Sequence, residues 1–133
     1  MTRTVLLDAE AVSRLVDRSP QMQAWATVVR KRKARLHLSA VTLAEVSTGA
    51  PRDAGIHRAV NGMALHAVTP EIGYAAGEMR ARVRRRKQRD LTVDAIVAAT
   101  AAALPGPAVV VTSDASDLTA LLEGTDVRVA SIT

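Results

Sequence analysis

Short apolar runs alternate along the chain with longer segments in which apolar residues recur at helical spacing. The runs predict strands at residues 5–7, 36–39, 65–68, 108–112 and 127–130. The helical spacing predicts helices at 9–16, from 20 into the basic residues after 29, from 42 to near 49, at 56–63, from 70 into the arginine-rich segment after 79, at 93–104 and from 116 to 123. Strands that alternate with helices and are apolar on both faces are typical of a parallel sheet with helices on both sides. The pattern therefore predicts an α/β fold.

Helix start signals support these boundaries. Ser19-Pro20 and Thr69-Pro70 each place a capping hydroxyl directly before a proline, which is favoured at the first helical position. No repeat, low-complexity tract or linker interrupts the pattern. The 133 residues are therefore predicted to form one domain, residues 1–133.

The composition narrows the chemistry that is available. The chain has no cysteine, which excludes disulfides, thiolate zinc sites and cysteine nucleophiles. No apolar run is long enough to span a bilayer, and the first residues do not form a signal peptide. Glycine-rich phosphate-binding motifs are absent too, which disfavours enzymes that use nucleotide cofactors. We therefore expect a cytoplasmic protein with no membrane contact.

Four carboxylates fall where a strand gives way to a helix, or in the first turn of a helix: Asp8, Glu45, Asp94 and Asp114. Each alone has a structural explanation. Asp8 and Asp114 suit N-caps, Glu45 completes a capping box that begins at Thr42, and Asp94 suits the positive end of the helix dipole. Taken one at a time, these acids do not indicate a functional site.

Taken together, they do. In an open parallel sheet, ligands bind outside the carboxyl ends of the strands, where Asp8 and Asp114 fall and which Glu45 follows closely. Two unit charges about 4 Å apart repel by about 4 kcal/mol at an effective dielectric near 20. A cluster of acids therefore persists only if some members are protonated or a cation neutralises them. Oxygen ligands without histidine or cysteine select Mg²⁺ or Mn²⁺.

The segments that carry these acids resemble a known family. In order, they are Leu7-Asp8, SAVTLAEV at 39–46, LTVDAIVAATA at 91–101 and VTSDASDL at 111–118. Their order and separation resemble those of PIN domains, and more narrowly those of the VapC-type ribonuclease toxins of bacterial toxin–antitoxin pairs. The resemblance implies a three-layer α/β/α sandwich with a mostly parallel sheet. It also implies a Mg²⁺- or Mn²⁺-dependent endoribonuclease that forms a homodimer and is inhibited by a cognate antitoxin protein.

The resemblance assigns roles to individual residues. Asp8, Glu45, Asp94 and Asp114 match the catalytic acids of the family. Asp8, Asp94 and Asp114 are the first choices as metal ligands, and Asp117 matches a further ligand, although it also suits the first turn of a helix.

Three residues near these acids have open roles. Thr112 and Ser113 stand where the family often has a hydroxyl in contact with water or phosphate; equally, they suit strand-end hydroxyls bonded to the backbone. Glu10 departs from the family, which usually has a hydroxyl residue there. Either Glu10 adds a carboxylate to the site, or it faces solvent and the hydroxyl contact is missing.

The charge of +5 is concentrated in two clusters, at 30–35 and 80–89. Both end predicted helices, where cations are favoured by the helix dipole and commonly form a solvated face. The second cluster exceeds what the dipole requires, and its end lies five residues before Asp94. We therefore predict that this cluster binds RNA phosphates through Arg82, Arg85, Arg86 and Arg89.

Two other functions fit parts of the pattern. One is a catalytically degraded PIN-like module that binds RNA or protein, for which Glu10 is the main argument. The other is a receiver-like signalling domain, which also places acids over Mg²⁺ at strand ends. The receiver is disfavoured by the two basic clusters and by the absence of paired acids after the first strand.

Overall fold

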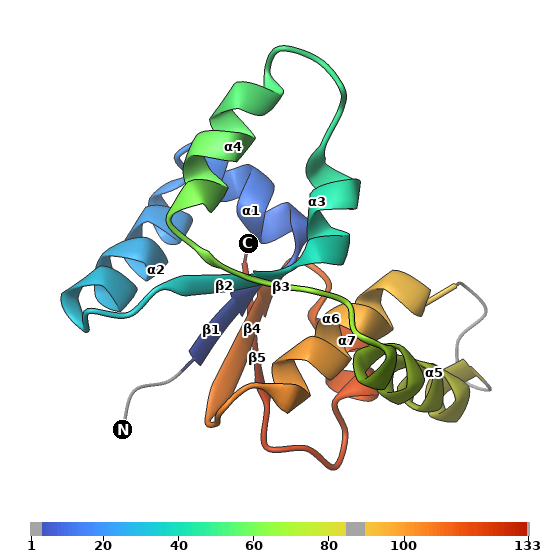
Figure 1. Ribbon diagram of the computed structural model, residues 1–133. Helices are drawn as coiled ribbons and strands as arrows, with labels where there is room; N and C mark the ends of the chain where they lie inside the picture. The colour runs from blue at the N-terminus through green and yellow to red at the C-terminus, as the bar shows by residue number, and fades with distance from the viewer. Residues whose placement is uncertain (1–3, 85–89, 133) are drawn as a thin grey trace.

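In the computed structural model, residues 4–84 and 90–132 are described (Figure 1). The strands are β1 (Thr4–Leu7), β2 (Leu36–Ser39), β3 (Ala64–His66), β4 (Ala108–Thr112) and β5 (Arg128–Ser131). The helices are α1 (Ala9–Val16), α2 (Pro20–Lys31), α3 (Ala40–Val46), α4 (Asp53–Asn61), α5 (Pro70–Arg84), α6 (Thr92–Ala103) and α7 (Ala115–Leu121). Among the described residues, no helix has the length and apolar character that crossing a membrane requires.

The strands form one sheet in the order β3-β2-β1-β4-β5, and all of its pairings are parallel. The chain winds outward from β1 to β2 and β3 on one side, and then crosses to β4 and β5 on the other. The direction of winding therefore reverses between β1 and β4, where Leu7 pairs with Val111. This position is the topological switch point of the sheet. In sheets of this kind, the crevice at the carboxyl ends of those two strands is the preferred ligand site.

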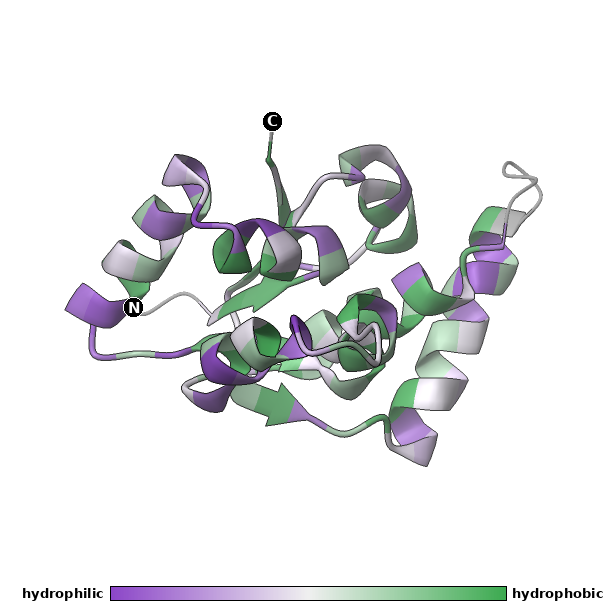
Figure 2. Cartoon of the chain, turned by 90° about the horizontal axis from the view of Figure 1, so that it is seen from above, coloured by the Kyte–Doolittle hydropathy of each residue, from purple (hydrophilic) through white to green (hydrophobic). Residues whose placement is uncertain are grey.

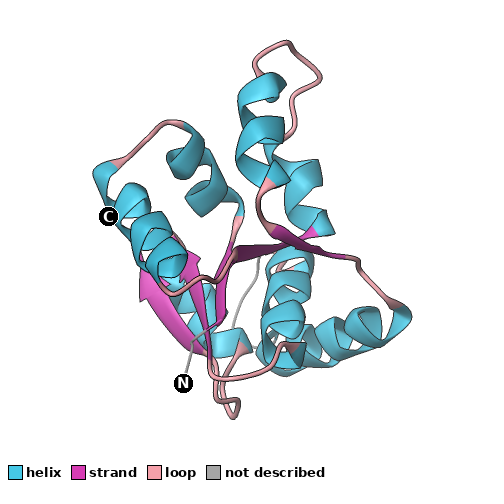
Figure 3. Ribbon diagram, turned by 60° about the vertical axis from the view of Figure 1, so that its left-hand side comes forward, coloured by secondary structure: helices cyan, strands magenta, loops and turns pink. Residues whose placement is uncertain are grey.

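Two apolar cores cover the two faces of the sheet. Val5 and Leu7 point into a core formed with α1, α2 and α4, whereas Leu6 points into a second core formed with α5, α6 and α7. Val109 and Val111 follow Val5 and Leu7, because successive side chains of a strand alternate between faces. Figures 1 and 3 show helices on both sides of the sheet. The predicted α/β/α sandwich is confirmed.

Small residues let α6 pack closely in the second core. Ala95, Ala98, Ala99 and Ala101 of this helix are buried, and Leu6 and Val110 meet the same core from the sheet. Each Å² of apolar surface buried here stabilises the fold by about 25 cal/mol. Alanine also gives up little side-chain entropy in a helix. The start of α6, with Asp94 in its first turn, is therefore held firmly against the sheet.

Some boundaries differ from the predicted ones. Helix α3 begins at Ala40 rather than Thr42, because Ser39 accepts a hydrogen bond from the Val41 N–H at 3.2 Å and caps the helix. Helix α4 begins at Asp53, three residues earlier than predicted. The Asp53 carboxylate accepts hydrogen bonds from the Thr48 and Gly49 N–H groups and the Thr48 hydroxyl, which fixes the loop before the helix. The start of α3 is thus set by a side-chain cap, and the start of α4 by hydrogen bonds from the preceding loop to its first residue, neither of which the apolar pattern reveals.

Candidate metal centre

Asp8 lies at the carboxyl end of the central strand β1 and is 9% exposed. It is the N-cap of α1, and its Oδ1 accepts a hydrogen bond from the Ala11 N–H at 2.9 Å. The Asp8 N–H itself donates to the Val111 carbonyl at 3.2 Å, which extends the pairing of β1 with β4. Asp8 is therefore a cap, as one prediction held, and it also stands at the switch point of the sheet.

Thr112 connects the ends of the two strands at the switch point. Its hydroxyl, which is fully buried, donates a hydrogen bond to Asp8 Oδ2 and accepts one from the Asp114 N–H at 2.8 Å. The Thr112 side chain is thus bonded within the protein, while Ser113 beside it is exposed. This geometry favours a positioning role for Thr112, and of the two hydroxyl residues it leaves Ser113 open to solvent.

Three further acids converge at the same edge. Asp94, Asp114 and Asp117 each offer a carboxylate oxygen, and these oxygens lie within 4.8 Å of one another. Asp94 comes from the first turn of α6, Asp114 from the residue before α7, and Asp117 from the first turn of α7. Asp117 is only 3% exposed, and the Asp114 side chain makes no capping hydrogen bond to α7. Capping therefore does not account for this group of carboxylates.

Glu45 reaches the site from α3, although its place in that helix differs from the prediction. Because Ser39 caps α3, Glu45 lies in the last turn, and the predicted capping box with Thr42 is wrong. Partial burial raises the pKa of the Glu45 carboxyl, and the nearby charges of Asp94 and Asp8 raise it further. Glu45 is therefore close enough to both of these acids to share their electrostatic field.

The same field acts on Asp8. Burial raises the pKa of the Asp8 carboxyl, and the charges of Glu10 and Asp114 add to the effect. The hydrogen bonds from Thr112 and from the Ala11 N–H act in the opposite direction, because they stabilise the carboxylate. The raised pKa means that the ionised form of Asp8 is less favourable here than in water, and a bound cation would relieve this cost.

The ligand types of this cluster fit a hard divalent cation. Asp94, Asp114 and Asp117 supply only carboxylate oxygens, and Asp8 stands next to them through Thr112 and Asp114. Mg²⁺ and Mn²⁺ prefer such ligands. The buried acidic cluster is thus the kind of site that binds a divalent metal.

Glu10, the departure from the family pattern, faces solvent. Its Oε1 accepts a hydrogen bond from Arg14 Nε at 3.0 Å, one turn later in α1, and forms an exposed ion pair. Of the two alternatives for this position, the structure thus favours the one in which Glu10 is not a ligand and a hydroxyl contact is missing.

The predicted RNA-binding arginines lie partly beyond the described residues. Arg82 is exposed on α5, whereas Arg85, Arg86 and Arg89 belong to the segment 85–89, outside the described residues. Sequence reasoning gave no separate role to Arg80, whose guanidinium donates a hydrogen bond to Thr92 Oγ1 at 2.8 Å. Because Thr92 begins α6 two residues before Asp94, this bond ties α5 to the helix start that carries Asp94.

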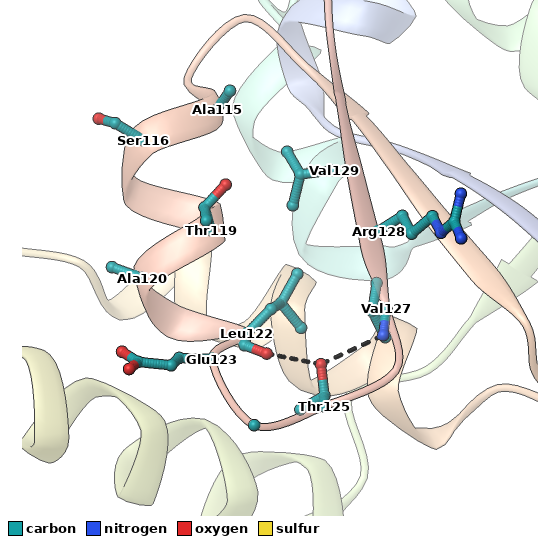
Figure 4. Close-up of a pocket in the computed structure, with 11 residues that line it drawn as sticks. Ala115, Ser116, Thr119, Ala120, Leu122, Glu123, Thr125, Val127, Arg128 and Val129 are labelled. Carbon is teal, nitrogen blue, oxygen red and sulfur yellow. Dashed lines mark hydrogen bonds between the residues drawn. The ribbon is translucent and has the colours of Figure 1, made fainter.

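A hollow of about 850 Å³ lies between α7 and the edge strand β5 (Figure 4). Its lining runs from Ala115, directly after Asp114, to Val129 of β5. It includes the turn in which Thr125 Oγ1 donates to the Leu122 carbonyl and accepts from the Val127 N–H. Glu123 is the only carboxylate among its lining residues. This hollow is therefore separate from the acidic cluster.

Comparison with known proteins adds a family and a fold. A family model described as PIN domain matches residues 5–119. No match was found among curated proteins. Among solved structures, VapBC2 from Rickettsia felis bound to a promoter DNA fragment has a TM-score of 0.79 at 12% identity, covering 98% of this chain and 99% of that one.

Two other solved structures are similar over nearly the whole chain. DNA-bound VapBC from Salmonella typhimurium has a TM-score of 0.73 at 17% identity and covers 98% of both chains. FitAcB from Neisseria gonorrhoeae has a TM-score of 0.71 at 19% identity and covers 96% of this chain and 97% of that one. At these identities, the likeness establishes a shared fold.

Proposed function

Because the chain belongs to the PIN domain family, whose members are typically nucleases, we propose that it is a metal-dependent endoribonuclease of the VapC type. One observation carries the proposal: carboxylate oxygens of Asp94, Asp114 and Asp117 lie within 4.8 Å of one another at the sheet edge that Asp8 and Glu45 also reach. Among the described residues, this cluster includes no histidine, cysteine or lysine that could act as a nucleophile. Direct hydrolysis of a phosphodiester by water is the reaction that fits it.

The residues divide the work as follows. Asp94, Asp114 and Asp117 would hold a Mg²⁺ or Mn²⁺ ion, and Asp8 would be a direct or water-mediated ligand. When bound, the ion supplies Lewis-acid stabilisation of the phosphate charge and lowers the pKa of water. Thr112 keeps Asp8 and the Asp114 backbone in place. Glu45, on the rim, accepts a hydrogen bond from the attacking water and orients it.

The reaction is a simple displacement at phosphorus. The water oxygen bonds to phosphorus and gives up one proton to solvent, the bond from phosphorus to the 3′ oxygen breaks, and the 3′ oxygen takes up one proton from solvent. The products are a 5′-phosphate and a 3′-hydroxyl, as the family resemblance implies. Arg82, exposed on α5, and Arg85, Arg86 and Arg89 after it bind neighbouring phosphates of the RNA.

The partner and location follow from the same proposal. The similar solved structures VapBC2, VapBC and FitAcB are toxin–antitoxin complexes. Their likeness to this chain supports a partner protein of the antitoxin kind. We propose that this chain acts in the cytoplasm as a homodimer and is inhibited by a cognate antitoxin protein. The alternative is a non-catalytic RNA- or protein-binding module, for which the solvent-facing Glu10 is the supporting observation.

Cleavage of a labelled RNA by the purified protein tests the proposal. We expect cleavage with Mg²⁺ or Mn²⁺, none in excess EDTA, and a loss of at least about a hundredfold in Asp94→Asn, since removing a ligand costs more than removing an outer contact. Asp126→Asn is the matched control, because it makes the same change at an exposed aspartate remote from the cluster. Undiminished cleavage in EDTA would refute the mechanism, and no cleavage by a metal-loaded wild type would favour the binding module.

A further inference from the structure

The first of the two basic clusters, at 30–35, lies in a segment that contains no acidic residue. Residues 18–44 contain six lysines and arginines and no aspartate or glutamate. Twelve cations and thirteen acids remain for the rest of the chain, which therefore has a net charge of −1 against +6 for this segment. An imbalance this local creates a positive field over one region of the surface.

Five of these cations form a continuous group, Arg30, Lys31, Arg32, Lys33 and Arg35, which we call the basic surface. All five are exposed, and within the described residues none of them forms an ion pair with a carboxylate. Figure 2 shows this end of α2 as a hydrophilic stretch at the left edge of the molecule. The basic surface is thus not neutralised by the fold itself.

The helix dipole explains only part of this group. Arg30 and Lys31 lie in the last turn of α2, where cations stabilise the helix end. Lys33 and Arg35 lie beyond the helix. Lys33 also adopts a left-handed backbone conformation, with φ 57°, where the turn is closed by hydrogen bonds from Lys33 N–H to the Arg30 carbonyl and from Ala34 N–H to the Val29 carbonyl. Glycine or asparagine is favoured at such a position, so the cation is kept against the local backbone preference.

The basic surface lies at the amino ends of the strands, and the acids lie at the carboxyl ends. It directly precedes the start of β2, where Leu36 pairs with Val5, whereas the acids follow the carboxyl ends of β1 and β4. A four-residue strand is about 13 Å long at about 3.3 Å per residue. The basic surface lies where β2 begins and the acids lie where strands end, so about one strand length separates them. In Figure 1, the end of α2 lies at the far left, away from α6 and α7.

We propose that the basic surface binds the phosphate backbone of a part of the RNA that is not being cut, so that RNAs long enough to reach both edges bind more tightly than short ones. The inference rests on the proposed nuclease function for its choice of RNA as the ligand. Binding at a second surface adds to binding at the first through a high effective concentration. The surface therefore discriminates between substrates by their length.

A membrane surface fits these residues less well. A helix that lies on a bilayer needs a wide apolar face directed outward. The apolar residues Met22 and Val29 of α2 are instead buried in the core of the protein, and of the large apolar side chains of α2 only Val28 is prominently exposed, at 44%. RNA phosphates need no apolar face and match five cations without neutralising acids.

Binding of two RNAs to one cleavage-deficient protein tests the inference. The protein is Asp94→Asn, and the RNAs are a labelled single-stranded hexamer and a labelled unstructured single strand several times longer. The patch variant carries Arg32→Gln, Lys33→Gln and Arg35→Gln. Its matched control carries Arg52→Gln, Arg58→Gln and Arg128→Gln, which removes the same charge at exposed positions elsewhere.

We expect the patch variant to bind the long RNA roughly ten- to hundredfold more weakly and the hexamer as before. The log–log salt slope for the long RNA falls by about 2, because each phosphate contact of a single strand contributes about 0.7. In the control variant, the affinities for the two RNAs fall slightly and by the same factor. Equal losses in the two variants, or an unchanged affinity of the patch variant for the long RNA, would overturn the inference.

Two further outcomes separate this inference from the proposed function. If the wild type cleaves neither RNA but long-RNA binding still depends on the patch, the nuclease proposal fails and the inference stands. If the patch variant loses sedimentation with anionic phosphatidylglycerol vesicles while keeping its affinity for the long RNA, the surface binds membranes and the inference is refuted.

Discussion

Thr112 links two of the acids at the candidate metal centre. Its single hydroxyl donates to Asp8 Oδ2 and accepts from the Asp114 N–H, so it fixes one acid through the side chain and another through the backbone. Both bonds are sheltered from water, since Thr112 has no exposed area. The hydroxyl thus holds together carboxylates that would otherwise move apart to reduce their repulsion.

Removing this hydroxyl should weaken metal binding without touching a ligand. We expect Thr112→Val to lower Mn²⁺ affinity about ten- to hundredfold, as for other outer contacts of metal ligands, and to cost about 1–3 kcal/mol of stability through the unsatisfied Asp8 oxygen. Thr112→Ser, which keeps the hydroxyl, should retain most of the Mn²⁺ affinity and most of the stability. Calorimetric titration with Mn²⁺ and thermal unfolding measure the two effects.

Thr100→Val is a matched control for this change. Thr100 is also buried, but its hydroxyl donates to the Ile96 carbonyl within α6, two turns from Asp94. The Thr100→Val variant should be somewhat less stable than the wild type and should bind Mn²⁺ with the same affinity. Equal Mn²⁺ affinity in Thr112→Val and the wild type would show that Thr112 does not position the acids.

The individual acids illustrate how far sequence reasoning reaches at this scale. Asp8 and Asp114 were predictable because each follows a strand that ends at the switch point. Asp94 follows no strand, so its first-turn position marked it as a candidate but the topology did not place it at the switch point. The role of Glu45 in α3 was misread, because the helix start depends on whether Ser39 or Thr42 provides the cap, and both residue types suit a cap.

At the scale of elements, strand β3 is held to β2 partly by two histidines. His37 Nδ1 and His66 Nε2 lie 2.8 Å apart, and the rings come from neighbouring strands in which Ser39 pairs with His66. This hydrogen bond requires one ring nitrogen to be an unprotonated acceptor. Partial burial lowers the pKa of His37, and the charges of His66 and Arg35 lower it further.

The lowered pKa of His37 predicts a loss of stability in mild acid. A histidine whose folded pKa is below its unfolded value, about 6.5, binds more protons in the unfolded state as the pH falls. Its contribution is thus complete above about pH 6.5 and is lost below it. We expect the difference in unfolding free energy between wild type and His37→Asn to shrink from pH 7.5 to pH 5, as a hydrogen bond of about 1 kcal/mol is lost.

Denaturant unfolding at several pH values checks this expectation, with His57→Asn as the control. His57 is exposed on α4, away from the sheet. A difference between wild type and His37→Asn that stays constant or grows as the pH falls would contradict the account. Asp8 and Glu45 act in the opposite sense, because their raised pKa values make the folded state bind more protons in acid, and the subtraction removes their effect.

The apolar pattern predicted most elements but not all of their ends. The bounds of α1, β2 and β4 agree with the prediction, because each begins or ends where the hydrophobic period changes. Strand β3 lies at 64–66 rather than 65–68, since an edge strand is fixed by its pairing with β2 more than by its own short sequence. The histidine contact between the two strands had no signal in the sequence, where His37 and His66 are far apart.

At the scale of the whole molecule, the acids of the candidate metal centre and the basic surface lie at opposite ends of the strands. The acids gather at the carboxyl edge, where parallel strands and following helices bring distant residues together. The basic surface lies at the other edge, before β2. The order β3-β2-β1-β4-β5 creates this polarity, because every strand runs in the same direction. The fold thus gathers a repulsive set of acids without a local sequence signal for their contact.

The central claim is that these acids bind one divalent metal at the switch point of the sheet. An anomalous difference map from a Mn²⁺-soaked crystal tests it most directly. The account predicts a peak about 2.1 Å from carboxylate oxygens of Asp94 and Asp114, at the octahedral ligand distance of such ions, with Asp117 and Asp8 around it. A crystal that accepts Mn²⁺ elsewhere and shows no peak between these carboxylates would contradict it.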